Sequence, residues 1–267
     1  MDTTIARQPT HYRQGGKRLL RKVPEITLFF WIVKLLTTAM GESTSDFLVF
    51  KINPYLAVLL GGVALTIALT LQFSVRRYVA WIYWLCVAMV AVFGTMAADV
   101  VHIQFGVPYV VSTILFAISL ALVFKVWHLQ EKTLSIHSIT TPKREVFYWL
   151  TVMATFALGT AAGDMTAVTL HLGYFSSGLL FAGLIVLPAL GYWLLGLNEI
   201  FSFWLAYILT RPLGASFADW MGKSKAVGGL GWGDGRVGFS LAALIVVFVL
   251  YLSVSHHDIR RQDEQSR

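Results

Sequence analysis

The sequence predicts an all-α integral membrane protein, a bundle of eight transmembrane helices. Of the 267 residues, 57% are apolar and only 13% are charged, about half the charged fraction of a typical soluble domain. Eight continuous apolar segments also approach the ~20 residues that a helix needs to cross ~30 Å of hydrocarbon. These segments are 25–45, 55–74, 78–98, 108–127, 146–164, 174–195, 199–219 and 237–254. Together these observations exclude a soluble globular protein, a disordered chain and a disulfide-linked scaffold.

The basic residues indicate how the helices are oriented. Fifteen of the 21 Lys and Arg residues fall in two polar tails, 1–22 and 256–267, and in the connections after the second and fourth helices. The opposite connections hold only Lys51, Lys223, Lys225 and Arg236. The positive-inside rule therefore predicts a multi-pass membrane protein with both termini in the cytoplasm. Topology accounts for the net charge of +7, so we expect the lipid bilayer as partner and no nucleic acid.

A repeated motif occupies the odd-numbered segments. It consists of Trp, Gly ten residues later and Asp five residues after that, W-x9-G-x4-D. The four copies are Trp31–Gly41–Asp46, Trp84–Gly94–Asp99, Trp149–Gly159–Asp164 and Trp204–Gly214–Asp219. Because one copy falls in every second helix, we predict four tandem parallel two-helix repeats, with the odd helices lining a core. The expected boundaries of these repeats are 23–75, 76–128, 129–197 and 198–255.

These repeats resemble those of a known family. The segments that carry the likeness are KVPEITLFFWIVKLLTTAMGESTSDF (22–47), LSIHSI (134–139), FYWLTVMATFALGTAAGD (147–164) and YILTRPLGASFAD (207–219). The chain resembles a bacterial multi-pass membrane protein family built of four tandem two-helix repeats with a characteristic tryptophan. The resemblance extends over nearly all of residues 22–254 and implies the eight-helix architecture. Because the family is a repeat of unknown function, the resemblance implies no activity and no site residues.

The four motif aspartates are the first candidates for a functional site. They are Asp46, Asp99, Asp164 and Asp219, and parallel repeats would put them at one depth near the extracytoplasmic ends of the odd helices. A ring of carboxylates there is typical of cation pathways. The alternative is that each aspartate merely ends its helix at the membrane interface, where a charge costs less than at the bilayer centre.

Three charged residues break the repeat pattern and add a second candidate region. Glu42 stands where the other repeats have Thr or Ala, and it shares a helix face with Asp46. Lys34 and Arg211 are predicted near mid-membrane, and Pro212 is expected to loosen its helix there. These departures favour a site between the first and fourth repeats. A structural salt bridge from Lys34 or Arg211 to Glu42 is the alternative.

Two histidines extend the acidic set toward a metal site. His102 and His171 follow the second and third motif aspartates on the same predicted side of the membrane. The candidate ligands are Glu42, Asp46, Asp99, Asp164, Asp219, His102 and His171. Oxygen donors with one or two imidazoles suit Mn²⁺ or Mg²⁺ better than a soft metal. No resident cofactor is expected; the ion would be bound as a substrate.

We therefore expect an inner-membrane ion transporter for a divalent metal cation, one form of which would be an exporter coupled to protons. Glu42, the four aspartates, Lys34 and Arg211 would line the ion pathway. One alternative is an anion or organic-acid carrier that binds its substrate at Lys34 and Arg211. Another is a structural or sensory membrane protein with a closed ion-pair network. The usual enzyme motifs do not occur, so an enzyme is not expected, and a homo-oligomer is compatible with so small a bundle.

Overall fold

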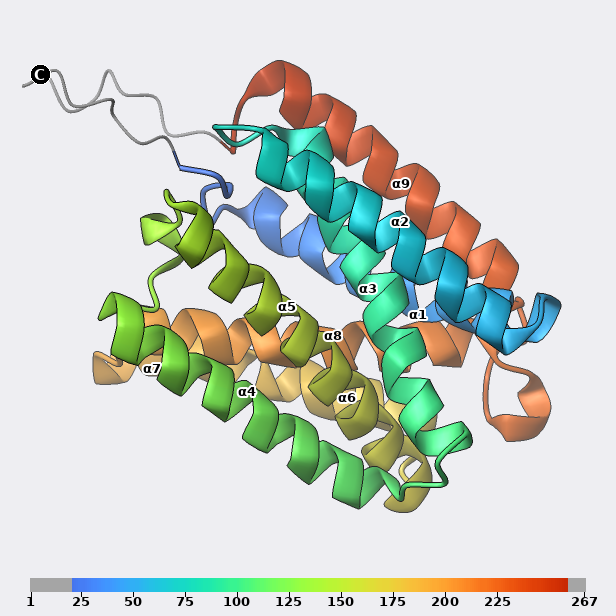
Figure 1. Ribbon diagram of the computed structural model, residues 1–267. Helices are drawn as coiled ribbons and strands as arrows, with labels where there is room; N and C mark the ends of the chain where they lie inside the picture. The colour runs from blue at the N-terminus through green and yellow to red at the C-terminus, as the bar shows by residue number, and fades with distance from the viewer. Residues whose placement is uncertain (1–20, 259–267) are drawn as a thin grey trace, which may run out of the picture.

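The computed structural model describes residues 21–258, which fold into a helical bundle without strands (Figure 1). The described helices are α1 (Leu28–Lys51), α2 (Pro54–Ser74), α3 (Ala80–Ile103), α4 (Tyr109–Glu131), α5 (Pro142–Asp164), α6 (Gly173–Leu184), α7 (Val186–Leu195), α8 (Glu199–Gly222) and α9 (Asp234–Ser255). A π-helical turn, Met165–Thr169, directly follows α5. The two consecutive helices α6 and α7 occupy one predicted span. They separate at Ile185 because the ring of Pro188 conflicts with the carbonyl four residues earlier, at the end of α6.

Six of the helical segments are long and apolar enough to cross a membrane. They are α2, Ala80–His102, α4, Pro142–Thr169, Gly173–Leu195 and α9. α1 and α8 are as long as α3, at 24 residues each, but they are not among the six. Both carry buried charges, Lys34 and Glu42 in α1 and Arg211 in α8, which lower the hydropathy of these helices. The structure therefore supports a multi-pass membrane protein, whereas the expected count of eight spans stays a prediction.

The helices form an inner and an outer layer. α1, α3, α5 and α8 make a closed inner ring, in which α1 contacts α3, α3 contacts α5, α5 contacts α8 and α8 contacts α1. Each inner helix is covered by the outer helix of the repeat before it: α2 packs on α3, α4 on α5, and α6 on α8. α9 closes the circle by packing on α1 (Figure 1). Each inner helix therefore buries its outer face mainly against a helix from a neighbouring repeat, not against one from its own.

The motif glycines set the close spacing of the inner ring. Each glycine lies against the residue three positions before the motif glycine of the next repeat. The contacts are Gly41 with Ala91, Gly94 with Phe156, Gly159 with Arg211 and Gly214 with Thr38. A methyl group at any of the four would overlap its neighbour, so the small residue is required for the helix backbones to approach. The fourth contact returns to the first repeat and makes the ring pseudo-fourfold.

A ring of aromatic side chains follows the same order nearer the start of the inner helices. The residue before each motif tryptophan is also aromatic, and it packs on the tryptophan of the next repeat. The ring-centroid distances are 5.8 Å for Phe30–Trp84, 5.7 Å for Tyr83–Trp149, 6.2 Å for Tyr148–Trp204 and 5.7 Å for Phe203–Trp31. Such tilted pairs stabilise packing beyond the area they bury. Equivalent contacts at two levels show that the four inner helices are parallel.

The two ends of the inner ring therefore differ. We call the end where α1, α3, α5 and α8 begin the terminal end, and the end with the motif aspartates the distal end. At the terminal end, backbone hydrogen bonds tie residues 21–25 across the bundle: Tyr78 N–H to Arg21 C=O, Lys22 N–H to Ile139 C=O, and Glu25 N–H to Asp258 C=O. Lys22 also pairs with Glu145, which is fully buried. Lys22 and Asp258, the residues of the two expected tails that make these contacts, are buried. The rest of these tails at residues 1–20 and 259–267 lies outside the described part.

Candidate cation site and buried ion pair

Arg211 lies at the centre of the inner ring. It comes from α8, which continues as one helix through Pro212. Its guanidinium is fully buried, and Nη2 donates to Glu42 Oε2 at 2.5 Å, to Thr160 Oγ1 at 2.8 Å and to Thr95 Oγ1. These three acceptors occupy the same repeat position in α1, α5 and α3. One long side chain from the fourth repeat thus reaches the other three repeats on the pseudo-fourfold axis.

Each acceptor of Arg211 is itself oriented. The hydroxyls of Thr95 and Thr160 donate to the carbonyls four residues earlier in their own helices, at 2.9 and 3.0 Å, so their lone pairs remain for the guanidinium. Glu42 supplies the negative charge and is also buried. Of the two salt bridges considered from sequence, the structure contains the one from Arg211. Breaking such a buried pair on one side leaves an uncompensated charge, which is costly in the interior.

Lys34 occupies a different position, closer to the terminal end. It is buried, and its Nζ lies 4.1 Å from the ring centroid of Phe156 and 4.0 Å from that of Tyr207. Within residues 21–258 this amino group has no hydrogen-bond partner. The two aromatic faces stabilise its charge through cation–π contact. Lys34 and Glu42, both predicted to line an ion pathway, are therefore not paired with each other.

An acidic cluster lies on the distal side of Arg211. We call Glu42, Asp46 and Asp219 the carboxylate group, because one oxygen from each lies within 4.8 Å of the others. Lys223, directly after α8, pairs with Asp46 and lies 3.7 Å from Asp219 Oδ1. Burial disfavours the charge on Lys223, but the nearby Asp219 and Asp46 carboxylates outweigh it and raise the pKa of Lys223. The carboxylate group thus already holds the protein's own cation.

The glycine-rich segment 228–233 fixes the position of Lys223. Its backbone N–H groups donate to the last carbonyls of α8: Leu230 to Trp220, Gly231 to Lys223, Trp232 to Met221 and Gly233 to Gly222. These carbonyls have no partner within the helix, so the segment supplies their hydrogen-bond donors. Gly228, Gly231 and Gly233 adopt positive φ, which glycine tolerates best. The segment therefore caps α8 and holds in place Lys223, the residue that follows this helix.

The other four predicted ligands do not join the carboxylate group. Asp99 and Asp164 are half-buried, and among residues 21–258 neither side chain makes a hydrogen bond or an ion pair. His102 turns toward the start of α4, with Nδ1 3.3 Å from both Ser112 Oγ and Val107 O. His171 is exposed in a turn with positive φ. The structure brings together three of the seven residues proposed from sequence.

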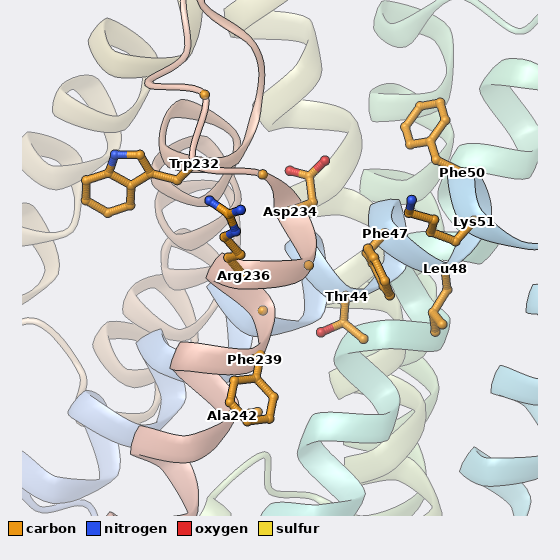
Figure 2. Close-up of a pocket in the computed structure, with 14 residues that line it drawn as sticks. Thr44, Phe47, Leu48, Phe50, Lys51, Trp232, Asp234, Arg236, Phe239 and Ala242 are labelled. Atoms are coloured by element: carbon orange, nitrogen blue, oxygen red, sulfur yellow. The ribbon is translucent and has the colours of Figure 1, made fainter.

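A groove at the distal end lies outside this arrangement. It has a volume of about 1010 Å³. The last turns of α1, the first turns of α9 and the glycine-rich segment bound it. Figure 2 shows Phe47, Lys51, Trp232, Arg236 and Phe239 around it. Neither Glu42 nor Arg211 lines the groove. It is therefore a surface feature of the bundle and not an entrance to the buried ion pair.

The repeats identify the family of the chain. The model of the family described as Repeat of Unknown Function (DUF347) matches residues 29–78, 82–133, 147–196 and 202–258. The chain belongs to this family. Each DUF347 match contains one inner helix and the outer helix that follows it, so the family repeat is also the structural unit. No curated protein and no solved structure matches the chain.

Sequence reasoning missed three residues of the site. Thr95 and Thr160 stand at the position of Glu42 in the second and third DUF347 repeats, and both bind Arg211. Lys223 was counted only as a basic residue of a loop. Its position four residues after Asp219, one helical turn away, is the signal that could have identified the contact.

Proposed function

We propose that this protein transports a cation across a bacterial inner membrane, a divalent metal ion being the substrate that its residues fit best. The observation that carries the proposal is the carboxylate group, in which three acidic side chains from α1 and α8 converge on the ammonium group of Lys223. Buried or intramembrane carboxylates are costly and commonly mark ion pathways. Oxygen ligands alone favour Mn²⁺ or Mg²⁺.

Charge balance supports exchange rather than simple binding. With every group ionised, Glu42, Asp46 and Asp219 together with Arg211 and Lys223 carry one net negative charge. Replacement of the Lys223 ammonium by a divalent ion would make the same set neutral. Asp99 and Asp164 lie half-buried at the equivalent position of the other two repeats and would attract an arriving cation from the distal end.

The orientation in the membrane follows from the basic residues. Lys and Arg concentrate at the terminal end, which the positive-inside rule assigns to the cytoplasm. In this proposal α1 and α8 also cross the bilayer, since six apolar helices surround and accompany them and their charges point into the ring. The protein would then have eight spans, and the carboxylate group would open toward the extracytoplasmic side.

A non-transporting structural role is the second candidate. It is favoured by Arg211, whose contacts with Glu42, Thr95 and Thr160 connect all four inner helices. A purely structural network would make every substitution affect stability and none affect metal binding. The following two experiments separate the candidates because they measure the metal directly.

The first experiment uses the repeat as its own control. Mn²⁺ binding to purified protein in detergent is measured by calorimetry, and uptake is measured in proteoliposomes containing a Mn²⁺-quenched dye. Asp219→Asn is expected to weaken Mn²⁺ binding at least about 30-fold, because it removes one of three charged ligands. Asp99→Asn, at the same repeat position outside the carboxylate group, is expected to change the dissociation constant less than about threefold. Equal binding by wild type and Asp219→Asn would contradict the proposal.

The second experiment removes the internal cation. Lys223→Met is expected to strengthen Mn²⁺ binding about tenfold, since the metal no longer competes with an ammonium group held by Asp46 and Asp219. Transport turnover is expected to fall, because without the Lys223 ammonium group nothing competes with bound Mn²⁺ and favours its release. Lys225→Met, in the same loop, is the control and should leave both values unchanged. Weaker Mn²⁺ binding by Lys223→Met would refute the exchange mechanism.

A further inference from the structure

Several buried donors on the terminal side of Glu42 have no acceptor. Within the described residues, Lys34 Nζ, Tyr207 Oη and two nitrogens of Arg211, Nε and Nη1, make no hydrogen bond. All three side chains are at most 1% exposed. Buried polar groups are nearly always paired with protein, water or a bound ion. Such a concentration of unpaired donors therefore calls for a ligand.

The donors surround a common aromatic side chain. The ring of Phe156 lies 4.1 Å from Lys34 Nζ and 5.3 Å from Arg211 Cζ. Lys34 Nζ also lies 4.0 Å from the ring of Tyr207, whose hydroxyl is one of the unpaired groups. Side chains from α1 and α8 thus bring two basic groups to the ring of Phe156 on α5.

The charges there are not balanced. Arg211 is neutralised by Glu42 through Nη2, but the charge of Lys34 meets only aromatic faces. The acidic side chains at the distal ends of α1 and α8, Asp46 and Asp219, face Lys223 instead. An isolated ammonium group in a low-dielectric interior is strongly disfavoured. A water molecule would satisfy donors, but only an anion bound beside Nζ would also stabilise the protonated form of Lys34.

We propose that Lys34, Tyr207 and Arg211 form a binding site for one small monovalent anion of the halide class. A halide accepts hydrogen bonds from any direction, and its charge balances that of Lys34. Rings of Lys and Arg are used in the same way by anion-selective pores. The site is separate from the carboxylate group and does not depend on cation transport.

The test compares anions at constant ionic strength. Purified protein in detergent is titrated with sodium chloride in place of sodium gluconate, whose anion is much larger than a halide. Thermal unfolding is followed by tryptophan fluorescence. Wild type is expected to show a saturable rise of about 3 °C in its midpoint. Lys34→Met is expected to abolish the rise. Lys51→Met, which changes an exposed lysine, should retain it.

A second variant covers the case in which Lys34→Met does not fold. Tyr207→Phe removes only one hydroxyl and is expected to raise the chloride concentration at half-saturation about three- to tenfold. Bromide should substitute for chloride with a similar midpoint shift. The proposal is overturned if the wild-type midpoint is the same in chloride and gluconate, or if the shift persists unchanged in both Lys34→Met and Tyr207→Phe.

Discussion

Replacing Gly159 with alanine is expected to lower the free energy of unfolding by about 3 kcal/mol, because the new methyl group would overlap Arg211 and Pro212 on α8. Cβ and Cγ of Arg211 begin the side chain that reaches Glu42, Thr95 and Thr160. Pushing α8 away from α5 therefore disturbs the buried ion pair as well as the helix packing. Equilibrium unfolding in mixed detergent, followed by tryptophan fluorescence, measures the change.

Gly183→Ala is the matched control for this substitution. Gly183 is also helical, in α6, but no neighbouring atom lies within 4 Å of the position of the new Cβ. Alanine there should be neutral or slightly stabilising, by up to about 1 kcal/mol, because it has the higher helix propensity. Equal stability of Gly159→Ala and Gly183→Ala would show that close approach of α5 and α8 is not required.

Replacing Arg211 with methionine is expected to lower the free energy of unfolding by about 3–5 kcal/mol. The change leaves the Glu42 carboxylate buried without its cation and removes the donor shared by Thr95 and Thr160. The cause of this loss is tested with the double variant that combines Glu42→Met with Arg211→Met. The double variant fills similar volume with apolar atoms, and its stability should lie within about 1 kcal/mol of wild type.

Mn²⁺ uptake by the same double variant distinguishes a transport role from a structural one. If the ion pair serves transport, the double variant is stable but its uptake in proteoliposomes falls to the level of empty vesicles. If the pair is only structural, recovery of stability is accompanied by recovery of uptake. A double variant whose loss of stability equals the sum of the losses in Arg211→Met and Glu42→Met would instead show that the energetic coupling between the two charges is small.

The sequence was sufficient for the features that depend on local pattern. Apolar runs of helical length predicted the helices, and identical spacing of Trp, Gly and Asp predicted four parallel repeats. The departures from the repeat correctly selected Glu42 and Arg211 as unusual. Helix ends were less well predicted. α1 extends to Lys51 rather than ending near residue 45, because the chain turns only at the Asn53 cap of α2.

The tertiary structure decided which of these residues meet. Four aspartates are equivalent in sequence, yet only Asp46 and Asp219 join Glu42, because α8 closes the ring against α1 and places Lys223 between them. Arg211 binds Glu42 because α8 packs on α1 when the ring closes. Lys34 lies about two helical turns before Glu42 on the same helix, too far along it to pair with that carboxylate. Spacing along a helix sets the face on which a side chain lies. Which helix that face meets depends on how the ring closes, and that is a property of the packed bundle alone.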